Sequence, residues 1–352
     1  MPKQSFMSPS VSKSSPSVSK SSKSTQPRDQ SSRTVKIATW NIHSAADDMT
    51  LAQYGKQAKL MGIAVLALQE TKRARAELED WNFAGDTLRG WRYIGVGMKR
   101  RAEAGVGFLL APGVEVLEIY EPSDNSRGRL LAIRLCVAGL RLKAVNCYAP
   151  HEGLSESTKD SFYAGLNNLN NQLDKQPRFK QVLFGDFKAV IGSDSAGQWG
   201  SACGSNSPNL RQTSGNGLRL LKHCHHRGLM LANTWKRCRR RHRGTHFLQL
   251  TKCWRRLDYV ALPKLLFNLV RSCRARTGLS LAEGRLKHAN FTDHNIVICT
   301  LAVPSRWRWK QIASRKPRKK SCTVRRLPDS KGDRRVSCFF GPFGGRACGA
   351  QT

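Results

Sequence analysis

The stretch Gln181-Val-Leu-Phe-Gly-Asp-Phe-Lys188 says most about the fold, because a short apolar run ends there in Gly185 and the acidic Asp186. An apolar run of this length with turn-forming boundaries is typical of a buried β-strand. Eight similar runs lie at Val35–Trp40, Ile63–Gln69, Gly105–Ala111, Leu130–Val137, Leu140–Tyr148, Leu229–Asn233, Leu257–Leu262 and Asn295–Val303. The pattern therefore predicts about nine strands.

Apolar residues recur at helical spacing in three segments, Leu51–Met61, Ser155–Leu173 and Gly217–Arg227. Ser155 can cap the second helix, and Gly228 is typical of the end of the third. Many strands and few helices within one unit predict two packed sheets with helices outside. We expect a four-layer α/β sandwich.

Charge divides the chain into three parts. Residues 1–33 are rich in Ser and Lys, and residues 305–352 are strongly basic without an apolar pattern, so we expect both segments to be disordered. The folded domain is expected at 34–304. Of the net charge of +36, residues 1–33 carry +5 and residues 305–352 carry +12, which leaves about +19 on the folded domain. A basic surface of this size predicts a polyanionic partner, with DNA or another nucleic acid first.

No apolar stretch approaches the roughly 20 residues that span a bilayer, so we expect no membrane insertion. No apolar leader follows the N-terminus, and the 11 cysteines include no C-x-x-C pair. This pattern indicates reduced thiols inside the cell. The basic run at 314–320 is compatible with nuclear import, so we expect an intracellular and nuclear protein. No sequence signal indicates a protein partner.

Polar residues lie at the ends of several predicted strands. They are Asn41, Glu70, Tyr148, Asp186, Asp258, Asp293 and His294. Separate strands can deliver such side chains to one rim of a sandwich. Carboxylates, an amide and one imidazole without a thiolate cluster suit Mg²⁺ or Mn²⁺ rather than zinc.

The ordered motifs Thr-Trp-Asn41, Leu-Gln-Glu70-Thr, Tyr148-x-Pro, Gly-Asp186-Phe, Leu-Asp258-Tyr-Val and Asp293-His294 resemble the exonuclease–endonuclease–phosphatase superfamily. This superfamily includes DNase I, apurinic endonucleases and the endonuclease domains of non-LTR retrotransposons. The resemblance covers about residues 34–303, and an Asn-Gly-x-x-Leu helix before Asn233-Thr234 is similar to the retrotransposon type. A parent retrotransposon would need a reverse transcriptase, which is not in this sequence. Two origins stay open: a fragment, or a separately retained endonuclease domain.

The resemblance implies metal-assisted hydrolysis of a phosphodiester in DNA. Glu70 would be the principal ligand of Mg²⁺ or Mn²⁺, with Asn41 beside it and Asp293 contributing to a second metal position. Asp186 would orient or deprotonate the attacking water, and Tyr148 would touch the phosphate. His294 would pair with Asp258, which fixes the imidazole and favours its charged form.

Two positions depart from the family pattern. The family motif Gly-Asp-x-Asn ends here in Lys188, which cannot accept a hydrogen bond but can bind phosphate as a point charge. Lys188 either substitutes electrostatically and leaves a weakened nuclease, or pairs with Asp186 and removes the base. The family's Thr-Trp pair is replaced by Thr245-His246, so Thr245 is left out of the predicted site.

Residues 236–256 carry nine Lys and Arg residues, interleaved with aromatic residues and without an acid. We expect this segment to track the phosphate backbone of a nucleic acid. The contacts are expected from Arg239, Arg240, Arg241, Arg243, Trp254 and Arg255. A metal-dependent endonuclease is the first hypothesis, and an inactive nucleic-acid-binding remnant is the second. Two less favoured hypotheses are a phosphoinositide or sphingolipid phosphoesterase and a protein-binding scaffold.

Overall fold

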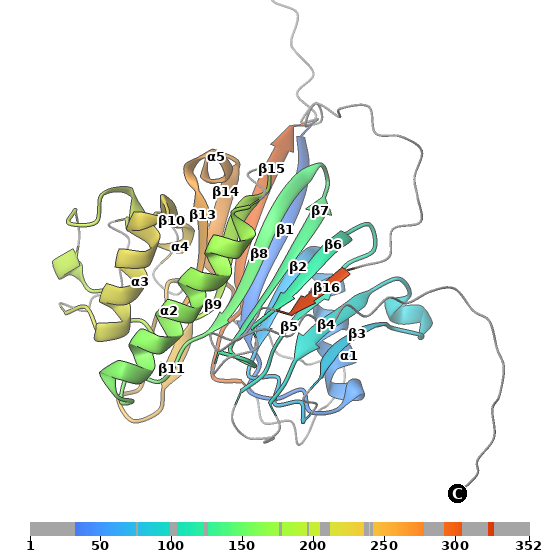
Figure 1. The fold of residues 1–352 in the computed structure, drawn as a ribbon, viewed down its shortest axis with the longest axis horizontal. Helices are drawn as coiled ribbons and strands as arrows, with labels where there is room; N and C mark the ends of the chain where they lie inside the picture. Colours follow the sequence, from blue (N-terminus) through green and yellow to red (C-terminus); the bar gives the residue numbers. More distant parts are fainter. Residues whose placement is uncertain are drawn as a thin grey trace, which may run out of the picture. The chain divides into compact units, whose positions relative to one another are not determined.

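The computed structural model describes residues 32–74, 77–98, 104–122, 126–175, 178–195, 197–204, 212–235, 239, 242–277, 292–304 and 323–326. These residues form two β-sheets and the helices that cover them (Figure 1). Of residues 1–33, which were predicted to be disordered, residues 1–31 lie outside the described residues, whereas Ser32 and Arg33 belong to a strand. Most of the predicted C-terminal tail also lies outside the described residues.

The first sheet has seven strands in the order β14-β15-β1-β2-β5-β4-β3. Neighbours are antiparallel, except that β1 and β2 run parallel. The bounds are β1 Ser32–Asn41, β2 Ile63–Gln69, β3 Leu78–Asn82, β4 Arg92–Val96, β5 Val106–Leu110, β14 Val270–Ala275 and β15 Val297–Pro304.

The second sheet has the order β10-β13-β9-β8-β7-β6-β16. Here the pairs β8–β9 and β6–β16 are parallel. The bounds are β6 Glu115–Glu121, β7 Leu130–Val137, β8 Leu140–Tyr148, β9 Lys180–Asp186, β10 Leu229–Leu231, β13 Asp258–Pro263 and β16 Thr323–Arg326. A separate hairpin pairs β11 His246–Leu248 with β12 Cys253–Arg255.

The longer helices begin at side-chain caps. Asp47, Ser155 and Ser214 each accept a hydrogen bond from a backbone N–H in the first turn. The helices are α1 Asp48–Leu60, α2 Glu156–Leu173, α3 Gly215–His226, α4 Ala232–Trp235 and α5 Lys264–Phe267, with 3₁₀ turns η1 Asp86–Leu88, η2 Ser193–Ser195 and η3 Gly200–Ala202. No helix among the described residues is long and apolar enough to cross a bilayer.

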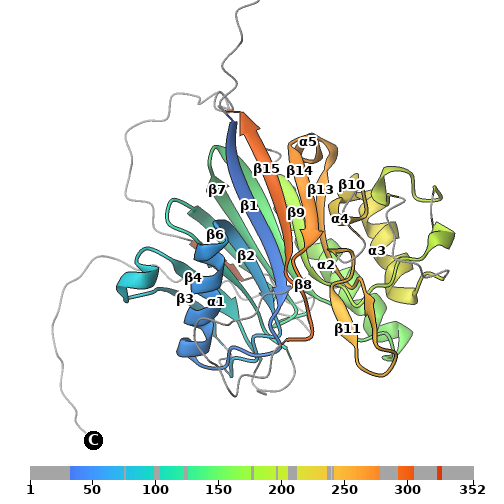
Figure 2. The same cartoon turned by 180° about the vertical axis from the view of Figure 1, so that it is seen from behind.

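Three apolar clusters separate four layers, which confirms the predicted α/β sandwich. Phe108 and Phe184, one from each sheet, contact each other in the cluster between the sheets. Leu166 and Leu220 lie in the cluster that joins α2 and α3 to the second sheet, whereas Leu51 on α1 packs against the first sheet. Figures 1 and 2 show α2 and α1 on opposite sides of the paired sheets.

The structure differs from the predicted elements at several places. The strand predicted at Leu229–Asn233 ends at Leu231, and the chain turns into α4 because the Asn233 amide donates to the carbonyl of Asp258. The predicted domain start at residue 34 lies inside β1. Thr323–Arg326, within the segment expected to be disordered, pairs with β6 as a strand. The strands β3, β4, β6, β11, β12 and β14 were not predicted.

A buried amide pair joins the two sheets beneath the rim. Gln69 of β2 donates to Asn146 Oδ1 of β8 at 2.6 Å. Asn146 in turn donates to the carbonyls of Leu68 and Gly107 in the first sheet. Both amides are fully buried, so shifting one sheet along the other would leave unpaired polar groups in the core.

Candidate active site

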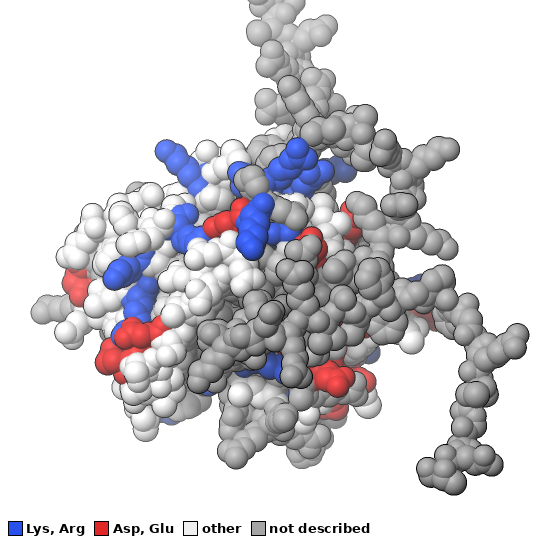
Figure 3. Space-filling view, in the orientation of Figure 1, with Lys and Arg blue, Asp and Glu red and all other residues white. Residues whose placement is uncertain are grey.

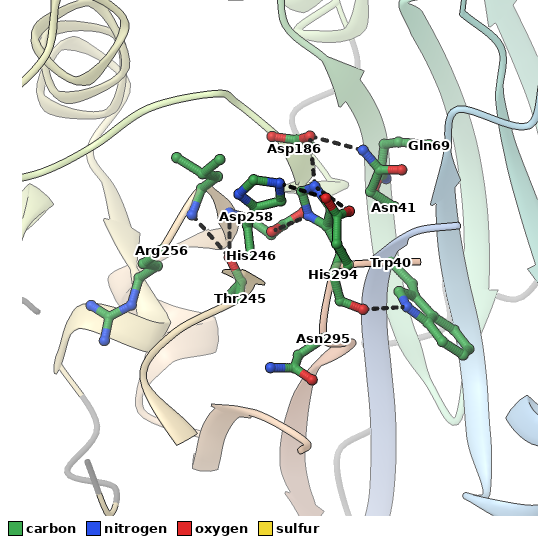
Figure 4. A network of polar contacts seen from close by, with 12 residues as sticks. Trp40, Asn41, Gln69, Asp186, Thr245, His246, Arg256, Asp258, His294 and Asn295 are labelled. Carbon is green, nitrogen blue, oxygen red and sulfur yellow. Dashed lines mark hydrogen bonds and ion pairs between the residues drawn. The ribbon is translucent and has the colours of Figure 1, made fainter. Parts of the chain in front are cut away.

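The predicted residues meet at one rim because the strand directions bring their ends together. The parallel pair β1–β2 ends with Asn41 opposite Gln69, and Glu70 follows directly. In the second sheet, Asp186 lies opposite both Tyr148 and Asp258, since β8 and β9 end where β13 begins. Figure 4 shows Asp186 beside Asn41, with Asp258 and His294 close by.

Asn41 connects the carboxylates of the two sheets. Its Nδ2 donates to Glu70 Oε1 at 2.7 Å and to Asp186 Oδ2 at 2.9 Å, while its Oδ1 accepts from the backbone of His43. Asn41 and Asp186 are buried, and Glu70 is 9% exposed. One amide therefore sets the spacing between an acid of the first sheet and an acid of the second.

Lys188 lies at the centre of this arrangement. Its Nζ is 2.7 Å from Asp186 Oδ2 and 3.5 Å from Glu70 Oε1, and it lies over the ring of Tyr148. The Lys188 backbone is left-handed, with φ +47°, and its N–H donates to Asp186 Oδ1. Burial lowers the pKa of Lys188, but Asp186, Tyr148 and Glu70 together outweigh burial, so the net pKa is raised and the ammonium group stays charged.

The two acids are ionised as a result. Burial raises the pKa of Asp186, but the charges of Lys188 and His294 hold that pKa below its usual range. Burial likewise raises the pKa of Glu70, while Lys188 and hydrogen bonds from Asn41 and Tyr148 bring that pKa below normal. An acid with a lowered pKa is a weaker base, so the Lys188 contact reduces the tendency of Asp186 to accept a proton.

Asp258 and His294 form a buried pair. His294 Nδ1 lies 2.9 Å from Asp258 Oδ2, and Nε2 lies 3.8 Å from Asp186 Oδ2. Burial lowers the pKa of His294, but the charge and hydrogen bond of Asp258 outweigh it and raise the net pKa. The predicted pairing is present in the structure, with the second ring nitrogen directed toward Asp186 and Asp293.

Asp293, the residue expected at a second metal position, lies beside two histidines. Its Oδ2 lies 2.9 Å from His246 Nε2, and its Oδ1 lies 3.8 Å from His294 Nε2. Burial raises the pKa of Asp293, but the His246 hydrogen bond and nearby His294 lower that pKa to about 2. Within the described residues, no hydrogen bond or ion pair joins Asp293 to Glu70 or Asn41.

Thr245, which the sequence analysis left out, positions the Asp258 strand. Its Oγ1 accepts from the backbone N–H groups of Leu257 at 2.9 Å and Asp258 at 3.1 Å. Trp40 adds a similar support by donating from Nε1 to the carbonyl of His294. The Thr-Trp family pattern indicated Thr245. The hydrogen bonds from the backbone of Leu257 and Asp258 show that Thr245 supports the position of Asp258.

The predicted nucleic-acid contacts are partly described. Arg239 and Trp254 are exposed, whereas Arg243 and Arg255 are partly buried. Arg240 and Arg241 lie outside the described residues. The hairpin β11–β12 that carries Trp254 and Arg255 is joined to the rim by the backbone pairing of His246 with His294. The face that carries α2 shows acidic and basic groups side by side (Figure 3), so it is not uniformly basic.

No protein-family model matches the sequence, and no curated protein matches it. Solved structures do match the fold. The endonuclease domain of TRAS1, a telomere-specific non-LTR retrotransposon, is 11% identical with a TM-score of 0.50, over 77% of this chain and 99% of that one. An AP endonuclease from Archaeoglobus fulgidus is 18% identical with a TM-score of 0.52, over 76% and 100%. AP endonuclease LMAP from Leishmania major is 16% identical with a TM-score of 0.54, over 77% and 89%. The chain has a DNase I-like α/β-sandwich fold, which these structures share.

Proposed function

We propose that the chain hydrolyses phosphodiester bonds in DNA at the rim formed by Asn41, Glu70, Asp186, Asp258 and His294. The observation that carries this proposal is the Asn41 amide, which holds Glu70 and Asp186 together from opposite sheets. The paired His294 lies at the same place. Structures with this fold include AP endonucleases and a retrotransposon endonuclease domain, which supports a nucleic-acid substrate.

Each side chain has a distinct task in an in-line hydrolysis. Asp186 orients a water molecule and accepts its proton as the water oxygen attacks phosphorus. The charged His294 imidazole and the Tyr148 hydroxyl donate hydrogen bonds to phosphate oxygens, and Lys188 adds a fixed positive charge. Asp258 keeps the imidazole oriented and charged. The bond from phosphorus to the ester oxygen breaks, and that oxygen leaves with the electron pair.

Glu70 and Asn41 would hold Mg²⁺ or Mn²⁺, since carboxylate and amide oxygens suit these ions. The Asn41 amide would have to turn for this, because its oxygen accepts from His43 and its nitrogen faces Glu70. When bound, the ion would neutralise phosphate charge and stabilise the leaving oxyanion. The donor chemistry fits, but the local charge opposes binding, because Lys188 and Lys72 each lie 3.5 Å from a Glu70 oxygen. We therefore infer weak metal affinity and reduced hydrolysis.

Binding of nucleic acid without cleavage is the second candidate. The observation that favours it is the 2.7 Å contact between Lys188 and Asp186, which occupies an oxygen of the proposed base. Both candidates use the basic surface, including Arg239, Arg243, Trp254 and Arg255. We also propose that the protein acts in the nucleus, which microscopy of a tagged full chain would test.

Nicking of supercoiled plasmid with Mg²⁺ distinguishes the two candidates. The natural chain, Lys188→Asn and Asp186→Ala are compared, with Asp174→Ala as a control that removes an ion-paired acid elsewhere. We expect slow nicking by the natural chain, faster nicking by Lys188→Asn, and a loss of ~100-fold or more in Asp186→Ala. Activity that survives Asp186→Ala contradicts the mechanism, and activity seen only in Lys188→Asn supports binding without cleavage.

Binding is measured separately by titrating labelled DNA at several salt concentrations. Affinity should fall steeply with salt, because each neutralised phosphate releases counterions. The failure of every version to bind at low salt would contradict both candidates.

A further inference from the structure

Three side chains beside the proposed hydrolytic centre form a cluster with a different chemistry. His246 Nε2 and Asp293 Oδ2 are 2.9 Å apart, and His294 Nε2 is 3.8 Å from the other Asp293 oxygen. The imidazole rings of His246 and His294 have centroids 4.4 Å apart. We propose that these three residues bind one divalent transition-metal ion of the zinc class, at a site separate from Glu70 and Asn41.

The backbone holds the three residues in place before any ion binds. His246 and His294 form an antiparallel bridge, although they belong to chain segments far apart in the sequence. The Phe247 N–H donates to the Asp293 carbonyl at 3.0 Å, and the Asn295 N–H donates to the Thr245 carbonyl at 2.6 Å. A site fixed in this way loses little conformational freedom on binding, which favours affinity.

The ligand set selects the metal. Two imidazoles and one carboxylate suit Zn²⁺, Co²⁺ and similar ions, whereas Mg²⁺ prefers oxygen ligands alone. Zinc sites with three protein ligands keep the fourth position for water. The Asp293 side chain is 42% exposed, so the cluster is open to solvent for entry of an ion and its water.

Asp258 supplies the support that metal-bound histidines usually have. It accepts from His294 Nδ1 at 2.9 Å, so the proton on Nδ1 is retained when His294 binds a metal through Nε2. In the charged imidazole Nε2 also carries a proton, and the ion displaces this proton to solvent. The proton on His246 Nε2, shared with Asp293 in the metal-free chain, is displaced by the ion and released to solvent. Such a carboxylate–histidine–metal arrangement is not part of the proposed phosphodiester chemistry.

Occupation of this site has a consequence for the proposed function. His294 Nε2 cannot bind a metal and donate a hydrogen bond to phosphate at the same time. A zinc-class ion bound here is therefore an inhibitor of the hydrolysis proposed above. Only this consequence rests on the proposed function, because the metal site itself is defined by His246, Asp293 and His294.

The test is a Co²⁺ titration of the full chain without DNA, followed by visible absorption, with Zn²⁺ added afterwards as competitor. We expect one Co²⁺ with the strong visible bands of four-coordinate nitrogen and oxygen ligation, displaced by Zn²⁺ and not by Mg²⁺. His246→Phe and Asp293→Asn should each weaken binding at least tenfold. Asp258→Asn should weaken it by roughly 10- to 100-fold through His294. His226→Phe, an exposed histidine on α3, is the matched control.

Circular dichroism of each variant establishes that it is folded, and Asp293→Asn replaces His246→Phe if the latter is not. Unchanged Co²⁺ affinity in a folded His246→Phe or Asp293→Asn variant overturns the proposal. Near-ultraviolet bands of cobalt–thiolate ligation overturn it as well, because they would assign the ion to cysteine. Since no DNA or cleavage is involved, a failure here is distinguishable from a failure of the proposed hydrolysis.

Discussion

Replacing Lys188 by Asn should convert a weak metal site into a strong one. The ammonium group lies 3.5 Å from Glu70 Oε1, so a divalent ion held by Glu70 would lie only ~5 Å from it, given metal–oxygen distances of about 2 Å. Charges of +1 and +2 at ~5 Å repel by about 1.7 kcal/mol at a dielectric constant near 80, and by more at lower values. Removal of Lys188 should therefore tighten Mn²⁺ binding by at least about tenfold.

Isothermal titration of Mn²⁺ into the full chain without DNA measures this change directly. Lys143→Asn is the control, since Lys143 is also a largely buried lysine paired with an acid, Asp174, but on another part of the chain. Equal Mn²⁺ affinity of Lys188→Asn and the natural chain would refute the reasoning, because the ammonium charge would then not control the cation affinity.

The same substitution has a second readout in stability. Asp186 is fully buried, and breaking a buried ion pair by removing one partner typically costs about 3–5 kcal/mol. Metal-free Lys188→Asn should therefore unfold at a lower temperature, and Mn²⁺ should restore part of the loss because it binds only the folded chain. A variant that is destabilised and not restored by Mn²⁺ would show that Lys188 serves the fold alone.

Four further predictions concern this centre and the residues around it. The pKa of His294 is raised in the folded chain, so its charged form should stabilise the fold fully below about pH 6.5, and this stability should be lost as pH rises through the folded pKa. Chemical unfolding at several pH values should therefore show a weaker pH dependence of the unfolding free energy in His294→Gln. In Asp258→Asn the pKa of His294 should fall, which histidine resonances in NMR titrations would report; an unchanged value would contradict the assigned pairing. Thr245→Val leaves two buried N–H groups without an acceptor and should lower the unfolding free energy by about 2–4 kcal/mol, whereas Thr245→Ser should lose far less. Trp254→Ala should weaken single-stranded DNA binding by about 1–3 kcal/mol if the exposed ring stacks on a base, as measured by fluorescence anisotropy.

The sequence predicted the central strands best, because they are continuous apolar runs. The bounds of β2, β7 and β8 agree with the predicted ranges, since both faces of each strand are largely buried. Strands β3 and β14 were missed because polar residues interrupt them, as in Leu78–Asn82 and Val270–Ala275. Such strands gain their regularity from hydrogen bonds to neighbours, which local composition does not reveal.

The residues of the candidate site could be predicted from the sequence, but the contacts between their side chains could not. Strand-end positions indicated Glu70, Asp186 and Asp258, and these residues meet because β2 and β9 end at the edge where β13 begins. The contact between His246 and Asp293 could not be predicted in this way, since it depends on a backbone bridge between distant segments. The position of Lys188 between two acids likewise depends on its left-handed backbone.

The Gln69–Asn146 amide pair links the geometry of the candidate active site to the docking of the two sheets. Glu70 comes from one half of the sandwich and Asp186 from the other, and the amide pair forms only when the two halves meet in a single register. We therefore expect the site to form only once the two sheets have docked. Because the first sheet takes strands from both ends of the domain, this dependence is best followed in the full chain, where Mn²⁺ affinity during refolding should report the docking of the sheets.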